Sequence, residues 1–260
     1  MVVFEAGLWA ALGQSALLVG ALLVARFPKL TEPRWLGLVM AFGAGALISA
    51  VTTDLVQPSY VEAGRAPTGI GLFLGAIGYY ALTTWLNRRA EREDPEEPVE
   101  EAEDLAGDAA VPAGADATAA RNLTVGMVLD GIPESIAIGL TLFGESVSVA
   151  LVGAVFLSNL PDAIGVAAAL LAGGVTLRKV LLRFAAIVGV GFVAGLVGYA
   201  ILKPTNADAI AIIQSIAAGA MIVVTVNEMI PLAVRGAGRR AGLAAGAGFA
   251  VAAFLSTLSG

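Results

Sequence analysis

Eight apolar stretches, each about as long as a membrane-spanning helix, most constrain what this chain can fold into. A helix needs about 20 mostly apolar residues to cross the hydrocarbon core of a bilayer. The stretches cover residues 6–25, 36–57, 68–87, 122–143, 147–172, 180–202, 207–231 and 240–258. They carry almost no polar face at helical period, and the mean hydropathy of the chain is +0.85. The sequence therefore predicts a single membrane domain over residues 1–260, an all-α polytopic helix bundle with eight transmembrane helices.

The basic residues indicate how this bundle is oriented. Of the 15 Lys and Arg residues, all but Arg65 and Lys203 fall in the odd-numbered connections between stretches. Basic connections collect on the cytoplasmic side of a membrane. We therefore expect a multi-pass protein of the cell (plasma) membrane with both termini extracytoplasmic.

An acidic segment separates the third stretch from the fourth. Residues 91–120 hold 11 of the 21 Asp and Glu residues, with Pro, Ala and Gly between them and no apolar period. Such a composition cannot bury enough apolar surface to fold. We expect a disordered cytoplasmic loop with solvated charges, and weak cation binding by this run is the alternative.

The second and seventh stretches resemble each other. An Ala-Gly-Ala sequence around Gly45 is followed nine residues later by Asp54, and one around Gly219 is followed nine residues later by Glu228. Because the two stretches run in opposite directions, they predict inverted repeats in a 3+2+3 arrangement around a central pair. Transporters with inverted repeats place their site near mid-bilayer on interrupted helices, which here would be the central pair. Chance similarity between Ala- and Gly-rich helices is the alternative.

The central pair carries two carboxylate motifs, each beside a proline. Acids at mid-membrane cost roughly 2.5–3.5 kcal/mol each on insertion scales, so they indicate a functional site. Proline lacks an N–H and clashes with the carbonyl four residues back, so each helix is expected to kink and to free an oxygen, at Leu129 and Leu157. The motifs are Asp130-Gly131-Ile132-Pro133-Glu134 and Ser158-Asn159-Leu160-Pro161-Asp162.

Spacing within each motif favours a shared cation site. Residues three or four apart lie on one helix face, which pairs Asp130 with Glu134 and Asn159 with Asp162. Crowded carboxylates repel one another, and a bound metal or protonation relieves this repulsion. Metal binding should therefore compete with protons. The metal is the substrate in this interpretation, and no cofactor is expected.

Other residues near these motifs have two interpretations. Ser158 can supply a hydroxyl ligand, and Asn159 can be a ligand or can bond across helices. Asp54 and Glu228 are further candidate ligands, although they lie near the ends of their stretches, where interfacial hydration also explains an acid.

Together, the eight stretches, the long loop and the two proline–acid motifs resemble the ZIP (Zrt/Irt-like) divalent-metal transporters, most closely the bacterial and archaeal branch. That family has a His-Asn-x-Pro-Glu-Gly pattern in its fourth span and an x-x-x-Pro-Glu pattern in its fifth, which build a two-metal site. The resemblance implies that Asp130 stands at the histidine position, Gly131 at the asparagine position and Glu134 at the metal-bridging glutamate.

In the fifth span, the resemblance implies that Ser158 and Asn159 are the ligands before the proline and that Asp162 replaces the second glutamate. The sequence from Ala217 to Pro231 also resembles the family's seventh span. By family behaviour, we expect transport toward the cytoplasm by rocking of one helix group against another. A homodimer in the lipid bilayer is implied, with divalent metal ions as partners and no nucleic acid.

The chain departs from the family pattern in having no histidine. An all-oxygen site suits Mn²⁺, Mg²⁺ or Ca²⁺ better than Zn²⁺, and Fe²⁺ stays open. Two other functions also stay open: a transporter of a monovalent or non-metal cation whose acids relay protons, and a non-transporting paralogue. An enzyme is not expected, because with neither His nor Cys the common nucleophile–base sets are unavailable.

Overall fold

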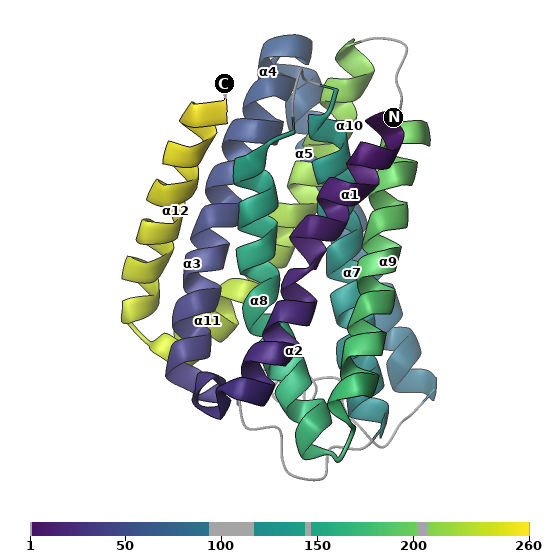
Figure 1. Ribbon diagram of the computed structural model, residues 1–260. Helices are drawn as coiled ribbons and strands as arrows, with labels where there is room; N and C mark the ends of the chain where they lie inside the picture. The colour runs from purple at the N-terminus through teal and green to yellow at the C-terminus, as the bar shows by residue number, and fades with distance from the viewer. Residues whose placement is uncertain (1, 94–116, 144–146, 202–206, 260) are drawn as a thin grey trace.

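The computed structural model describes residues 2–93, 117–143, 147–201 and 207–259, and these residues form a bundle of long helices (Figure 1). The first half contains α1 (Val2–Gln14), α2 (Ala16–Arg26), the 3₁₀ turn η1 (Pro28–Thr31), α3 (Pro33–Val51), the π-helical segment η2 (Thr52–Val56), α4 (Gln57–Ala63) and α5 (Arg65–Glu93). The second half contains α7 (Ala117–Thr141), α8 (Val149–Ala172), α9 (Leu177–Ile201), α10 (Ala207–Val224), the π-helical segment η3 (Thr225–Met229), α11 (Ile230–Ala237) and α12 (Arg240–Ser259).

The all-α membrane bundle predicted from the sequence is confirmed. Six helical passes within the described residues are long and apolar enough to cross a membrane: Val2–Arg26, Pro33–Ala63, Val149–Ala172, Leu177–Ala200, Ala211–Ala237 and Arg240–Thr257. The helices α5 and α7 correspond in sequence to the two remaining predicted stretches. That these two helices cross the membrane stays a prediction. Of the predicted acidic loop, residues 94–116 lie outside the described residues, while residues 91–93 and 117–120 are helical.

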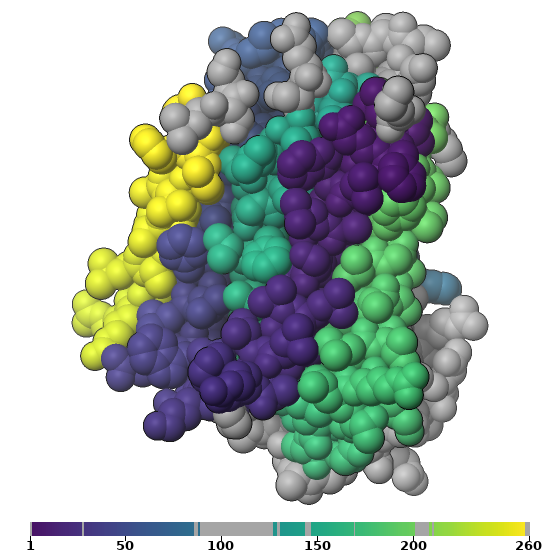
Figure 2. All heavy atoms as spheres, in the orientation of Figure 1, coloured from purple at the N-terminus to yellow at the C-terminus, as the bar shows by residue number. Residues whose placement is uncertain are grey.

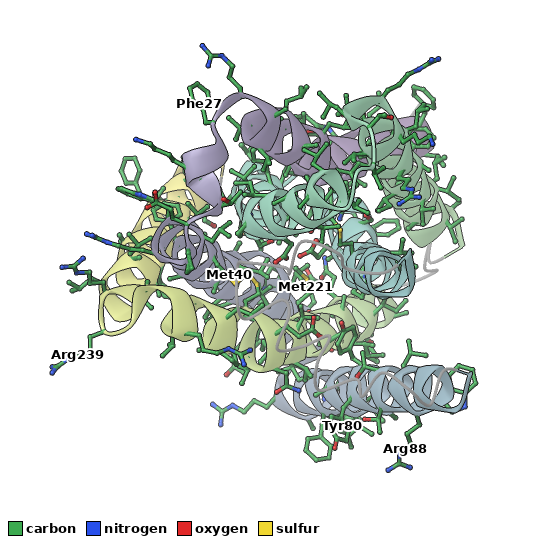
Figure 3. The ribbon with its side chains drawn as sticks, turned by 90° about the horizontal axis from the view of Figure 1, so that it is seen from below. Phe27, Met40, Tyr80, Arg88, Met221 and Arg239 are labelled. Carbon is green, nitrogen blue, oxygen red and sulfur yellow. The ribbon has the colours of Figure 1, made fainter. Side chains whose placement is uncertain are left out.

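Both termini lie at the same end of the bundle (Figure 1). Seen from the opposite end, Arg88 and Arg239 point away from the bundle, whereas Met40 and Met221 lie toward its middle (Figure 3). Both methionines are buried, at 7% and 1% exposure, so they pack in the core. The end of the bundle that carries Arg88 and Arg239 is thus opposite the end that carries both termini.

The packing of the helices follows the inverted repeat. Helix α3 packs against α12, and its counterpart α10 packs against α5, the counterpart of α12. Small residues make both contacts close: a Cβ at Gly45 would lie 1.9 Å from the Ala245 carbonyl oxygen, and one at Gly219 would lie 2.1 Å from that of Leu72. Glycine at these two equivalent positions therefore sets how closely the helix backbones approach in each half.

The interruptions expected in the central pair occur elsewhere. Helices α7 and α8 remain α-helical through Pro133 and Pro161. The α-helical pattern is instead replaced by π-helix at η2 and η3, which lie in the second and seventh passes. In both cases a proline follows, Pro58 or Pro231, and the clash of its ring with the carbonyl four residues back accounts for the widened turn.

The carbonyl freed by Pro161 does not open toward a ligand. A Cβ at Gly43 of α3 would lie 2.8 Å from the Leu157 oxygen, so the α3 backbone covers this carbonyl. The freed oxygen therefore lies in the close contact between α3 and α8, and its role as an extra ligand stays a prediction.

Candidate metal-binding site

Glu134 of α7 lies in the interior of the bundle and is 4% exposed. Two side chains of α8 bond to its carboxylate: Asn159 Nδ2 donates to Oε2 at 2.6 Å, and Ser158 Oγ donates to Oε1 at 3.3 Å. The two donors are consecutive residues of α8. Asn159 Nδ2 uses its second hydrogen for the Val155 carbonyl at 2.9 Å, whereas the single hydroxyl hydrogen of Ser158 is shared between Glu134 and this carbonyl, which is also 2.9 Å away. The structure therefore brings together three of the side chains that the sequence predicted as ligands.

A residue that the sequence prediction missed, Gln14, completes this set. It ends α1, is fully buried, and donates from Nε2 to Glu134 Oε2 at 3.2 Å and to the Gly131 carbonyl oxygen at 3.3 Å. The first pass lies across α8 and α9 (Figure 2), which brings α1 to the site. Gln14 and Ser15 are the only polar residues in the first apolar stretch, and this was the available signal.

The Glu134 site lies near the middle of the apolar passes that hold its partners, as expected for a site at mid-membrane depth. Gln14 is near the middle of the 25-residue Val2–Arg26 pass, and Asn159 is near the middle of the 24-residue helix α8. At such a depth, a carboxylate needs donors or a cation to offset the loss of hydration. Hydrogen bonds to a charged group contribute about 1.5–3 kcal/mol each, so the amides of Gln14 and Asn159 stabilise the charged Glu134 substantially.

The two remaining acids of the motifs are Asp162 and Asp130, and the structure gives less detail of their surroundings than for Glu134. Asp162 lies three residues after Asn159 on α8 and is half-buried. Asp130 lies one helical turn before Glu134 on α7, but its side chain is outside the described part of the structure. Among the described residues, no group of three or more His, Cys, Asp and Glu side chains could hold a metal ion. The hydrogen bonds given above therefore join one carboxylate, that of Glu134, to neutral amide and hydroxyl groups.

Asp54 belongs to a different cluster, at the end of the bundle where both termini lie. Its carboxylate accepts hydrogen bonds from three hydroxyls: Thr53 at 2.9 Å, Ser256 of α12 at 2.7 Å, and Ser148. Ser148 precedes α8, and its Oγ accepts from the Leu151 N–H at 3.0 Å. Eleven residues of helix separate Ser148 from Asn159, which places the Asp54 cluster about 16 Å along α8 from the Glu134 site.

Glu228 lies in η3, the counterpart of the segment that holds Asp54. Tyr79 of α5 donates to Glu228 Oε1 at 3.3 Å, and Tyr79 itself is 6% exposed. Both π-helical segments thus present an acid that accepts a hydrogen bond from the long helix packed against it, Asp54 from Ser256 of α12 and Glu228 from Tyr79 of α5. The repeated sequence pattern therefore corresponds to repeated local structure.

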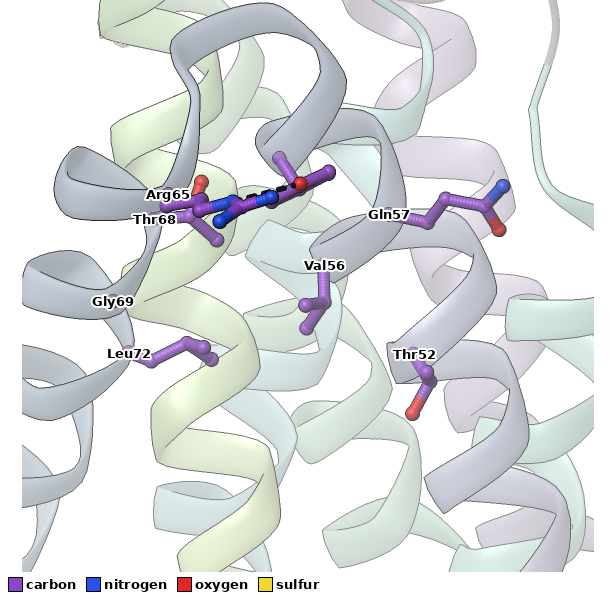
Figure 4. Close-up of a pocket in the computed structure, with 8 residues that line it drawn as sticks. Thr52, Val56, Gln57, Arg65, Thr68, Gly69 and Leu72 are labelled. Carbon is purple, nitrogen blue, oxygen red and sulfur yellow. Dashed lines mark hydrogen bonds between the residues drawn. The ribbon is translucent and has the colours of Figure 1, made fainter.

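A pocket opens beside η2 (Figure 4), and it is distinct from the Glu134 site. In it, Arg65 Nε donates to the Tyr60 hydroxyl at 3.1 Å. The residues that line this pocket include one arginine and no acid, so it offers no ligand set for a cation; they are Thr52, Val56, Gln57, Tyr60, Arg65, Thr68, Gly69 and Leu72.

Comparison with known families gives one match. A sequence model of the family described as "ZIP Zinc transporter" matches residues 83–256, which is more than half of the 260-residue chain. The matched range contains α7, α8 and the segment with Glu228, and it begins after Gln14 and Asp54. Comparison with curated proteins gives no match.

Proposed function

Because this chain belongs to the ZIP zinc transporter family, a family that moves divalent metals across membranes, we propose that its metal passes through the Glu134 site between α7 and α8 toward the cytoplasm. The observation that carries the proposal is the buried carboxylate at mid-membrane depth, surrounded by side chains that can exchange hydrogen bonds for metal coordination. Glu134 supplies the negative charge that offsets dehydration of the cation.

The neutral groups around Glu134 can change role when a cation arrives. A carboxamide is donor at nitrogen and ligand at oxygen, and a hydroxyl can donate a proton or offer its lone pairs. Asn159 and Ser158, which donate to Glu134 in this structure, would turn an oxygen toward the bound metal. Asp130 and Asp162 are proposed as further ligands, because they lie one turn from Glu134 and three residues from Asn159 on the same two helices.

We propose a preference for cations that favour oxygen, with Mn²⁺ first. The chain contains no His and no Cys, so no imidazole or thiolate is available to favour Zn²⁺. Carboxylate, amide and hydroxyl oxygens are the ligands typical of Mn²⁺, Mg²⁺ and Ca²⁺. Asp54 and Glu228 lie in their own clusters, and in this proposal they act outside the central site.

The arrangement in the cell is also a proposal. The end of the bundle with both termini would face outward and the Arg-rich end inward, as the positive-inside rule requires, in the plasma membrane. The homodimer implied by the family resemblance belongs to the same proposal.

The test is metal uptake into liposomes that contain the purified protein. Glu134→Gln keeps the size of the side chain but removes its charge, and we expect Mn²⁺ uptake to fall by about 100-fold, equivalent to about 2.7 kcal/mol. Asp208→Asn, which removes an exposed acid in the first turn of α10, is the matched control and should transport like the parent. Uptake by the Glu134→Gln protein at the parent rate would overturn the proposal.

A further inference from the structure

The carboxamide of Gln14 is only half satisfied. Both hydrogens of Nε2 are used, one by Glu134 and one by the Gly131 carbonyl. Its Oε1 atom is buried and accepts no hydrogen bond from any described residue. Because a fully buried amide oxygen normally has a donor or an ion as partner, this one requires an explanation.

The two hydrogen bonds fix the direction of the amide. If nitrogen and oxygen were exchanged, Oε1 would face the Glu134 carboxylate and the Gly131 carbonyl, and three acceptors would meet without a donor. The orientation with Nε2 toward Glu134 is therefore the stable one as long as Glu134 holds no cation. The unpartnered Oε1 is a consequence of that orientation.

Two glycines leave room for this side chain. A Cβ at Gly131 of α7 would lie 3.0 Å from both Nε2 and Oε1 of Gln14, and a Cβ at Gly191 of α9 would lie 2.8 Å from its Cγ. The amide thus occupies the space that a side chain at position 131 would take, beside the carboxylate one turn later. A glutamine on the first pass is held directly against the candidate site.

A second unpartnered group lies next to Gln14. Ser135 Oγ is buried, forms no hydrogen bond with any described residue, and would lie 3.0 Å from the same Cβ at Gly191. Ser135 is on the same face of α7 as Gly131, four residues later. Its hydroxyl can accept an amide hydrogen as well as donate one. Since neither group has a partner, Gln14 Oε1 and Ser135 Oγ do not bond to each other in this structure, so a rotated amide gains Ser135 as a partner for its nitrogen only if the Ser135 side chain rotates as well.

We propose that Gln14 is a ligand of the transported cation and that its carboxamide turns over when the cation binds. A cation on Glu134 repels the Nε2 hydrogens and attracts Oε1, so the terminal torsion, which has a broad energy profile, rotates by about 180°. Oε1 then coordinates the cation or its bound water, and Nε2 gains a partner when the Ser135 side chain rotates toward it. This inference rests on the proposed function of Glu134, which it deepens by adding a ligand from the first pass.

The proposal predicts a change in selectivity that a purely structural role of Gln14 would not produce. Histidine at position 14 would place an imidazole nitrogen at the cation, and nitrogen ligands favour Zn²⁺ over Mn²⁺. We expect Gln14→His to raise the Zn²⁺-to-Mn²⁺ ratio of binding constants by about tenfold or more. Gln14→Leu, which removes the ligand, should weaken Mn²⁺ binding by about tenfold or more.

The measurement is titration of purified protein with each metal alone, followed by uptake into liposomes. Gln214 of α10 provides matched controls, because it is also a buried glutamine and its amide donates to the Leu140 carbonyl at 3.4 Å, away from Glu134. Gln214→His and Gln214→Leu should leave the metal ratio and the Mn²⁺ affinity within about twofold of the parent. Gln14→Glu, which has almost the same shape, keeps an oxygen at the site if Gln14→Leu does not fold, and it should bind Mn²⁺ at least as tightly as the parent.

The outcomes separate this inference from the proposed function. If Glu134→Gln abolishes metal binding while Gln14→His leaves the metal ratio unchanged, Gln14 is not a ligand and only the inference fails. Weaker Mn²⁺ binding in Gln14→Glu would also overturn it. If Glu134→Gln binds metal like the parent, the proposed function itself fails.

Discussion

Two carboxylates of this molecule, Glu134 and Asp54, each accept hydrogen bonds from at least three side chains of the described residues, but the donors differ. Glu134 is bonded by two amides and one hydroxyl and is 4% exposed. Asp54 is half-buried and is bonded by three hydroxyls, from Thr53, Ser148 and Ser256. The first lies at mid-membrane depth, and the second lies at the end of the bundle near both termini.

This difference indicates different roles. The donors to Glu134 come from α1 of the first pass and α8 of the central pair, and their amides can offer oxygen to a cation. The donors to Asp54 come from its own segment, from the residue before α8 and from α12, so this carboxylate joins the ends of three passes. We therefore expect substitutions at Glu134 to affect transport most, and substitutions at Asp54 to affect stability most.

Three further variants test this comparison beside Glu134→Gln, and among them the largest effect is expected for Asn159→Leu. It removes the shortest of the described hydrogen bonds to Glu134, 2.6 Å, and an oxygen that could bind the cation. We expect uptake of Mn²⁺ into liposomes to fall by at least about tenfold, or about 1.4 kcal/mol. Thr225→Val is a suitable control, since Thr225 is 1% exposed and its hydroxyl donates to the Met221 carbonyl of its own helix. Equal losses in both variants would show that the effect of Asn159→Leu is not specific to the site.

An intermediate effect is expected for Asp54→Asn. The uncharged amide weakens the bonds from the three hydroxyls, so the protein should be less stable by about 1–2 kcal/mol, while Mn²⁺ uptake stays within about threefold of the parent. Thermal unfolding in detergent, together with liposome uptake, measures both quantities. A loss of uptake as large as that of Glu134→Gln, without a change in stability, would break the distinction between the two carboxylates.

The smallest effect is expected for Ser256→Ala, which removes a single bond of 2.7 Å to Asp54 Oδ1. The expected loss is about 1 kcal/mol, or a few degrees in the unfolding temperature, with uptake unchanged. Ser49→Ala is informative beside it, because Ser49 Oγ is buried and forms no hydrogen bond with any described residue, so its loss should cost less. A greater loss of stability in Ser49→Ala than in Ser256→Ala would contradict the contribution assigned to the Asp54 cluster.

The fold could be predicted from the sequence because apolar runs of about 20 residues leave few alternatives. The described helices lie over the predicted stretches, as α8 (Val149–Ala172) does over residues 147–172. The position of the irregular helix was predicted wrongly, at Pro133 and Pro161, because Pro58 and Pro231 also lie in or beside apolar stretches and packing decides which proline distorts its helix. At Pro161 the neighbouring α3 covers the freed carbonyl, and the helix stays α-helical. At Pro58 the strain is relieved by a π-helical turn.

Site residues could be predicted from the sequence only where they belong to one of the two proline–acid motifs. Glu134 and Asn159 stood out as polar groups beside prolines in apolar stretches, and the structure brings them within 2.6 Å. Gln14 is 120 residues away from Glu134 in the chain. A single amide in an apolar stretch is also common where helices bond to each other. The tertiary contact, which depends on Gly131 having no side chain, was needed to place Gln14 at the site.

The most direct test is to locate Mn²⁺ in a crystal of the protein by its anomalous scattering. The account predicts one peak within coordination distance, about 2.2 Å, of a Glu134 carboxylate oxygen, with an oxygen of Asn159 or Gln14 turned toward it. A peak at the Asp54 cluster or beside Glu228, with none at Glu134, would contradict the central claim that the metal is bound between α7 and α8.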